Sequence, residues 1–164
     1  MMYYIKNIVI EDARIIFRNF SGKSSQYNPA GNRSFALVLT QDEADQFAKD
    51  GWNVKYLKPR EPGDESTPYI NVNVKYFKDA PERNPHIYLV AGRKKTLMNE
   101  DTVGTLDYAE ITNVDLVVAP YRWSMQGRKG VAAYIKTMYV SIEEDFGGKY
   151  DFGDDNYEPF NLSE

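Results

Sequence analysis

Alternation of apolar and polar residues over short segments is the pattern that most limits how this chain can fold. In residues 69–77 the even positions are Ile70, Val72, Val74 and Tyr76. Because successive side chains of a β-strand point to opposite faces, this spacing predicts a strand with one buried face. Comparable segments predict strands at 3–10, 13–20, 33–40, 69–77, 86–91, 112–123 and 131–142. The chain is therefore expected to be mostly β.

Helical periodicity is convincing in one segment, residues 41–49. Thr40 can cap its first turn, Glu43 completes a capping box, and Gly51 can end it. Three segments rich in Gly, Pro, Ser and charge predict loops, at 21–32, 58–68 and 78–85.

Charge divides the chain into two parts. Residues 143–164 hold eight acidic residues and one lysine, a net charge of −7. Residues 1–142 hold 19 Lys and Arg against 16 Asp and Glu, a net charge of +3. We expect one folded domain, 1–142, and a disordered acidic tail, 143–164, because the tail cannot bury enough apolar area to order itself. A basic body that binds polyanions and a tail that competes with them would explain this division, and a tail that only aids solubility is the alternative.

Several classes of protein are disfavoured by what the sequence lacks. With no cysteine, the chain can form no disulfide, thiolate nucleophile or cysteine-ligated metal site. It shows no basic leader before an apolar run, and no stretch near the roughly 18 apolar residues that span a bilayer. We therefore predict no membrane association and a cytoplasmic location.

The sequence offers few residues that could carry out catalysis. His86 is the one histidine, and no phosphate loop, dinucleotide fingerprint or histidine-rich metal pattern occurs. Asp107, Glu110 and Asp115 could bind magnesium in a nuclease, but their spacing matches no specific pattern. We predict that the protein is not an enzyme, with no catalytic residues, no cofactor and no metal.

Two predicted strands carry cations and rings on the face opposite the core. In 13–20, the alternation assigns Ala13, Ile15 and Phe17 to the core, and the opposite face is Arg14, Ile16, Arg18 and Phe20. In 69–77, the opposite face is Tyr69, Asn71, Asn73, Lys75 and Phe77. A solvated face would more often carry Thr, Glu and Lys, so we interpret the second face as a binding surface.

The last two predicted strands form a hairpin with a basic end. Gln126 and Gly127 offer a turn centre, which places Arg128 and Lys129 at the tip. This turn pairs Trp123 with Gly130, Tyr121 with Ala132, Ala119 with Tyr134 and Val117 with Lys136. The opposite face is then an apolar stripe of Leu116, Val118, Val131 and Ile135, although a slip of one residue would invert the two faces.

Basic and aromatic side chains in combination favour single-stranded nucleic acid, because cations follow the phosphates while bases stack on rings. Trp123 is the central ring of this prediction, although a tryptophan in a hairpin can also simply pack on its neighbours. The predicted DNA-binding residues are Arg14, Arg18, Tyr69, Asn73, Lys75, Phe77, Arg93, Lys94, Lys95, Tyr121, Arg122, Trp123, Arg128, Lys129, Tyr134 and Lys136.

Two segments and the acidic ending resemble a known family. PYRWSMQGRKGVAAYIKTMYVSIEED (120–145) and ARIIFRNFSGK (13–23) resemble phage single-stranded-DNA-binding proteins of the T7-like replication type. The resemblance implies an OB-fold, a partly open five-stranded barrel, here with additional strands and one short helix. It also implies that DNA lies across the barrel face, on residues such as Tyr121, Trp123, Tyr134, Arg128 and Lys129.

The ending is similar to the acidic tails of such proteins, which contact polymerase, helicase or recombination partners. The residues that this likeness assigns to partner binding are Asp151, Asp154, Asp155, Tyr157, Glu158 and Phe160. Four residues, 161–164, follow Phe160, so recognition of a terminal carboxylate beside the ring does not transfer.

The sequence thus predicts a protein that coats and protects single-stranded DNA in replication or recombination, with a tail that recruits partners and competes with DNA. The main alternative is a β-rich protein-interaction or virion structural module. A strand-annealing recombination mediator and a metal-dependent nuclease are further alternatives. A homodimer is compatible with the resemblance, but no exposed apolar helix face points to one.

Overall fold

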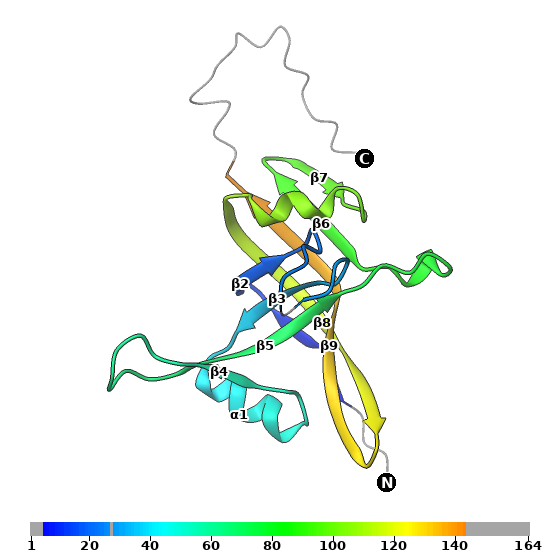
Figure 1. Ribbon diagram of the computed structural model, residues 1–164. Helices are drawn as coiled ribbons and strands as arrows, with labels where there is room; N and C mark the ends of the chain where they lie inside the picture. Colours follow the sequence, from blue (N-terminus) through cyan, green and yellow to red (C-terminus); the bar gives the residue numbers. More distant parts are fainter. Residues whose placement is uncertain (1–4, 27, 144–164) are drawn as a thin grey trace, which may run out of the picture.

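The computed structural model describes residues 5–26 and 28–143, which form one nine-stranded sheet, one α-helix and two short 3₁₀ helices (Figure 1). The strand order is β1-β8-β9-β5-β3-β2, with β4 beside β5, β6 beside β9 and β7 beside β6. The elements are β1 (Ile8–Ile10), β2 (Arg14–Asn19), β3 (Arg33–Val38), α1 (Gln41–Lys49), β4 (Lys55–Leu57), β5 (Thr67–Val74), η1 (Pro81–Arg83), β6 (His86–Ala91), β7 (Lys94–Leu97), η2 (Val103–Asp107), β8 (Ile111–Met125) and β9 (Arg128–Ile142).

The helix has the ends that its sequence predicts. The Thr40 hydroxyl accepts a hydrogen bond from the Glu43 backbone N–H at 3.1 Å, and the Glu43 carboxylate accepts one from the Thr40 N–H at 2.8 Å. This reciprocal pair satisfies two N–H groups that a helix start leaves without intrahelical partners. Gly51, with a φ of 99°, reverses the chain after the last turn.

The core follows the predicted alternation along β5. Ile70, Val72 and Val74 are buried, and they face buried side chains of β3 that include Phe35 and Leu37. Burial of each such side chain stabilises the fold by roughly 1.5–3 kcal/mol. The predicted strand over 69–77 ends earlier, at Val74, because the chain then leaves the sheet.

The predicted hairpin is present, with one correction to its register. Gln126 and Gly127 have φ values of 53° and 80°, which gives the left-handed turn that joins twisted strands. The structure confirms that Trp123 pairs with Gly130, Tyr121 with Ala132 and Ala119 with Tyr134, and that Leu116, Val118, Val131 and Ile135 are buried.

The prediction that Val117 pairs with Lys136 is wrong, because Val117 pairs with Thr137. The register shifts between Val117 and Val118, so that Lys136 is an extra residue on β9. Such a β-bulge bends a strand and redirects its side chains, and it occurs here where β9 changes neighbours.

A second irregularity reverses the predicted faces of β2 after Ile16, whereas Ala13 and Ile15 pack against the core as predicted. Phe17, expected in the core, has a φ of 53° and is 62% exposed. Phe20, expected on the opposite face, is fully buried and stacks on Phe35 with ring centroids 5.4 Å apart. The β2–β3 register shifts between Ile16 and Asn19, which moves every later side chain to the other face.

Two short strands, β4 and β7, lie where the sequence shows no alternation, and the predicted strand 3–10 is confined to Ile8–Ile10 within the described residues. Residues 144–164, which include the predicted partner-binding positions of the tail, lie outside the described part of the chain. Across 5–26 and 28–143, no helix is long and apolar enough to cross a membrane.

Candidate nucleic-acid interface

The candidate interface lies where β9 exchanges one neighbouring strand for another. β9 pairs in parallel with β5 at Ala133 and Tyr134, and in parallel with β6 from Thr137 to Ser141. Between β5 and β6, residues 75–85 leave the sheet, and they wall a hollow of about 580 Å³ above β8 and β9. The fold therefore places a concave surface beside the bulge at Lys136.

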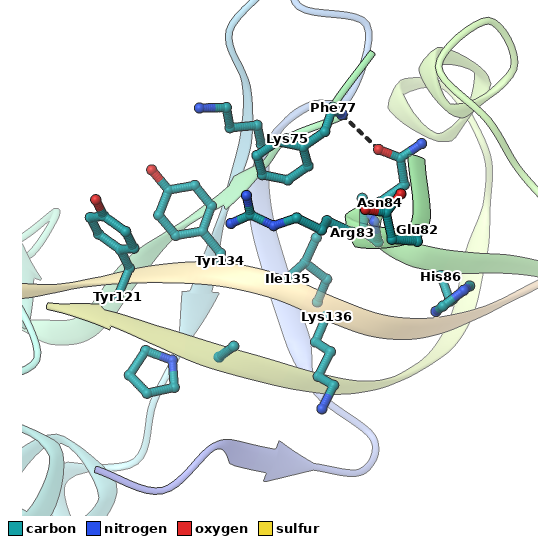
Figure 2. Close-up of a pocket in the computed structure, with 13 residues that line it drawn as sticks. Lys75, Phe77, Glu82, Arg83, Asn84, His86, Tyr121, Tyr134, Ile135 and Lys136 are labelled. Atoms are coloured by element: carbon teal, nitrogen blue, oxygen red, sulfur yellow. Dashed lines mark hydrogen bonds between the residues drawn. The ribbon is translucent and has the colours of Figure 1, made fainter. Parts of the chain in front are cut away.

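Three aromatic side chains border this hollow (Figure 2). Tyr121 on β8 and Tyr134 on β9 meet edge to face, with ring centroids 5.7 Å apart, and Tyr121 is 57% exposed. Phe77 lies opposite them, where the backbone N–H of Phe77 donates to the Asn84 side-chain oxygen at 2.6 Å. This hydrogen bond ties the two ends of the 75–85 excursion together.

Cations outnumber acids around the same hollow. The Lys75 Nζ atom lies 5.2 Å from the centroid of the Phe77 ring, and the Arg83 Cζ atom lies 4.6 Å from it. Lys136 is a third lining cation, whereas Glu82 is the one acid among the residues that line the hollow. Figure 2 shows Arg83 extending from η1 toward Tyr134, so rings and cations share one surface.

Two further hollows extend this surface along β5 and β9. Lys75 and Tyr134 also line the second hollow, which includes Arg33, and Asn73 lines both the second and the third. The Asn73 side-chain amide donates to the Ala133 carbonyl at 3.1 Å, which holds it at the junction. We call these three hollows together the groove.

The third hollow ends at Trp123, which lies directly over Gly130. A Cβ atom built on Gly130 would stand 2.8 Å from the Trp123 ring, closer than real Cβ contacts allow. Glycine at this position therefore lets the ring lie flat across the hairpin, where Trp123 keeps 40% of its surface exposed. The other tryptophan, Trp52, also lines this hollow and is buried.

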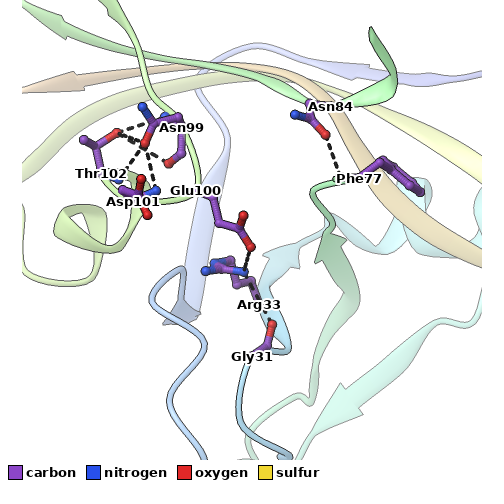
Figure 3. A network of polar contacts seen from close by, with 8 residues as sticks. All are labelled: Gly31, Arg33, Phe77, Asn84, Asn99, Glu100, Asp101 and Thr102. Carbon is purple, nitrogen blue, oxygen red and sulfur yellow. Dashed lines mark hydrogen bonds and ion pairs between the residues drawn. The ribbon is translucent and has the colours of Figure 1, made fainter. Parts of the chain in front are cut away.

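An ion pair, shown in Figure 3, and the buried hydroxyl of Tyr76 form the wall of the second hollow. The Arg33 Nη1 atom lies 3.4 Å from a carboxylate oxygen of Glu100. Beside them, the Tyr76 hydroxyl is buried and has no hydrogen-bond partner among the described residues. Burial raises the pKa of Tyr76 to about 12, against the lowering effect of Arg33 and with a smaller raising effect of Glu100, so the phenol stays neutral at physiological pH.

The structure brings part of the sequence-predicted set together. The predicted residues that line the groove are Asn73, Lys75, Phe77, Tyr121, Trp123, Tyr134 and Lys136. Arg122, Arg128 and Lys129 lie on the exposed end of the hairpin beyond it. Sequence reasoning missed Arg33, Arg83 and His86, which also line the groove. Strand alternation cannot identify Arg83, because Arg83 lies in a 3₁₀ turn. A single histidine in a sequence gives little indication of a binding role.

Other predicted residues lie elsewhere. Arg14 and Arg18 line a separate hollow, and Tyr69 packs edge to face on Phe17 with ring centroids 6.2 Å apart. The cluster Arg93, Lys94 and Lys95 lies on the β6–β7 hairpin.

Carboxylates that could have served a nuclease have other contacts. Asp107 accepts hydrogen bonds from the backbone N–H of Phe20 at 2.6 Å and from the Ser21 hydroxyl at 2.6 Å. Asp115 accepts one from the Asp12 N–H at 2.8 Å. Within residues 5–26 and 28–143, no three His, Cys, Asp or Glu side chains are grouped in a way that could hold a metal ion.

The sequence matches the family model described as "Putative phage ssDNA-binding domain" over residues 1–151. The chain belongs to this family. Membership confirms the suspected family and the prediction of a binding protein rather than an enzyme. No curated protein matches the chain.

Two solved structures of one phage protein share the fold. The single-stranded DNA-binding protein of bacteriophage Enc34, in complex with ssDNA, is 12% identical with a TM-score of 0.54, over 84% of this chain and 87% of that one. The same Enc34 protein in a second structure is 14% identical with a TM-score of 0.51, over 93% and 90% of the two chains. The gp2.5 protein of bacteriophage T7, also a single-stranded DNA-binding protein, is 13% identical with a TM-score of 0.41, over 95% and 97%. The predicted fold class, mostly β and OB-fold-like with one short α-helix, is confirmed.

Proposed function

We propose that this family member binds single-stranded DNA in the groove and so coats exposed strands during phage replication or recombination in the host cytoplasm. The observation that carries the proposal is the shared surface of Tyr121, Tyr134 and Phe77 with Lys75 and Arg83. The ssDNA complex of the Enc34 protein, which has the same fold, supports it.

Single strands suit this surface better than duplexes. Unpaired bases expose the faces that can stack on tyrosine and phenylalanine, and each stack contributes about 1–3 kcal/mol with little dependence on sequence. In a duplex those faces are already stacked on neighbouring bases. The groove cations would contact phosphates, so binding should weaken as salt displaces the released counterions.

A titration of tryptophan fluorescence with oligo-dT and with duplex DNA tests this function. Trp52 is 4% exposed, so quenching by DNA would report mainly on Trp123 at the end of the groove. We expect quenching by oligo-dT that weakens at higher salt, and much weaker quenching by duplex. The β-rich protein-interaction module, the main rival, predicts no quenching by either nucleic acid.

The variant Tyr134→Ala tests whether the DNA that quenches the tryptophan fluorescence is bound in the groove. Loss of one stacking ring should weaken oligo-dT binding by about 5- to 150-fold. The matched control is Tyr108→Ala, because Tyr108 is an exposed tyrosine outside the groove. Equal affinity of both variants and the unmodified protein would place DNA elsewhere.

We also propose that residues 143–164 form a separate acidic tail that competes with DNA for the folded body and recruits replication or recombination proteins. The net charge of −7 on these residues supports competition for the cations of the groove. Replacing the eight tail acids by their amides in the full chain should tighten oligo-dT binding at low salt. Unchanged affinity at low salt would reject the competition.

A further inference from the structure

A second cluster of rings and one cation lies on the outer face of the sheet, past the bulge in β9. Tyr88 on β6 and Tyr139 on β9 are paired neighbours whose rings stack, with centroids 5.1 Å apart and planes within 12° of parallel. The Lys95 Nζ atom, from β7, lies 4.7 Å from the centroid of the Tyr88 ring and 5.7 Å from that of Tyr139. We call these three residues the tyrosine platform.

The platform is not needed to fill the core. On the other face of the same two strands, Ile87, Met138 and Val140 are fully buried and supply the packing. Tyr139 keeps 37% of its surface exposed, and Leu97, which pairs with Tyr88, is 53% exposed. Part of the Tyr139 ring and the neighbouring Leu97 therefore remain open to a ligand, with a cation beside them.

Charge around the platform favours an anionic ligand. Lys95 projects over both rings, and Arg93 lies in the turn of the same hairpin. The acid opposite Tyr139 on β8 is Asp115, and its carboxylate accepts a hydrogen bond from the Asp12 N–H. A ligand with both flat apolar groups and negative charge would fit this combination, and a nucleotide has both.

The platform continues the groove in space. His86 lines the first hollow, and Tyr88 is two residues further on the same face of β6, about 6.6 Å away. On β9, the groove residues Tyr134 and Lys136 precede Tyr139, so the two surfaces meet along a single strand. From Gly130, under Trp123, to Tyr139 the strand extends for roughly 30 Å.

We propose that a single strand bound in the groove continues past Lys136 onto the tyrosine platform, where a base stacks on the exposed Tyr139 ring and Lys95 contacts a phosphate. This inference rests on the proposed function, because it extends the same DNA path. It makes the binding site longer than the groove alone. Short oligonucleotides fill the groove first, and only longer ones reach the platform.

The test measures affinity as a function of DNA length in the full chain. Oligo-dT from about 4 to 16 nucleotides covers the range of site sizes for one OB-fold. For Tyr139→Ala we expect unchanged affinity for the shortest DNA that binds and about 5- to 150-fold weaker binding of the longest. Lys95→Ala should show the same dependence on length with a smaller loss. Because Lys95 is exposed, this variant remains informative if Tyr139→Ala fails to fold.

Two controls separate this inference from the proposed function. Tyr108→Ala should bind every length normally, whereas Tyr134→Ala should lose affinity at every length. If Tyr134→Ala weakens binding but Tyr139→Ala and Lys95→Ala do not, the platform is not on the DNA path and the groove still is. A uniform loss at all lengths in Tyr139→Ala would also overturn the continuation. If Tyr134→Ala has no effect, the proposed function itself fails.

Discussion

The first hollow of the groove and the hollow beside β2 are both lined by arginine and tyrosine, yet Arg83 in the first and Arg18 in the second serve different purposes. In the first hollow of the groove, the Arg83 guanidinium lies over the Phe77 ring and makes no hydrogen bond or ion pair with any described residue. In the hollow beside β2, the Arg18 Nη1 atom donates to the Leu106 carbonyl at 2.7 Å and to the Ala109 carbonyl at 2.9 Å. The same residue types therefore leave donors available in one place and use them in the other.

This difference shows that composition alone does not define a nucleic-acid surface. A guanidinium that already donates to backbone carbonyls stabilises the fold, and binding a phosphate would require it to break those bonds. A guanidinium that rests on a ring keeps its donors for a ligand. Loss of Arg83 should therefore weaken DNA binding, whereas loss of Arg18 should weaken the fold.

The largest expected effect is on stability, from Arg18→Met. This change leaves the Leu106 and Ala109 carbonyls without their donor, which should lower the free energy of unfolding by about 3 kcal/mol. Arg14→Met is the matched control, because Arg14 is exposed and should change stability by less than about 0.5 kcal/mol. Urea denaturation measures both variants. A similar loss in both would contradict the structural role of Arg18.

The next effect is on salt dependence, from Lys75→Ala combined with Arg83→Ala. Removing two phosphate contacts should reduce the slope of log affinity against log salt by about 1.4, which is about 25-fold in affinity near 0.1 M salt. A charge-matched control combines Arg14→Ala with Lys49→Ala, two exposed cations outside the groove. Oligo-dT affinities over a series of salt concentrations supply the slopes. If the two double variants had equal slopes of log affinity against log salt, the groove cations would not differ from other exposed cations in their contribution to DNA binding.

A smaller effect should follow from Gly130→Ala. The new methyl group would meet the Trp123 ring, which must swing off the hairpin. We expect about fivefold weaker oligo-dT binding and a stability change below about 0.5 kcal/mol, because the hairpin end is exposed. In a Trp123→Ala background, Gly130→Ala should cost nothing further. An equal loss in both backgrounds would show that Gly130 acts through something other than the ring.

Much of the fold could be predicted because its signals are local. The capping box at Thr40, the turn at Gln126 and the alternation along β5 each depend on a few neighbouring residues. The bulges were not predictable in this way. Nothing in the sequence marks Phe17 for a left-handed backbone or Lys136 for an unpaired position, because tertiary packing sets both.

The candidate site was predictable to a similar degree. Alternation placed Lys75 and Tyr134 on the outer faces of their strands, and both line the groove. It also selected Arg18, because a strand pattern cannot show which carbonyls a distant 3₁₀ helix will bring near. Arg83 was missed for the opposite reason, since it lies outside any strand and its position depends on the return of the chain to β6.

The smallest expected effect is on the pH dependence of stability, through the buried hydroxyl of Tyr76 in the wall of the groove. Burial raises the pKa of Tyr76 to about 12, above the value near 10 of an unfolded chain. The folded state therefore keeps this proton to higher pH than the unfolded state does. Its stabilising contribution is complete below about pH 10 and is lost as the pH rises toward about 12.

Tyr76→Phe lacks this group and isolates its contribution. Other tyrosines titrate in both proteins, so the comparison of interest is the difference between their unfolding free energies at each pH. We expect the free energy of the unmodified protein to fall more steeply between about pH 10 and 12 than that of Tyr76→Phe. If the two plots of unfolding free energy against pH were parallel, water would reach the Tyr76 hydroxyl in the folded state. Tyr76 would then belong with the exposed rings of the groove.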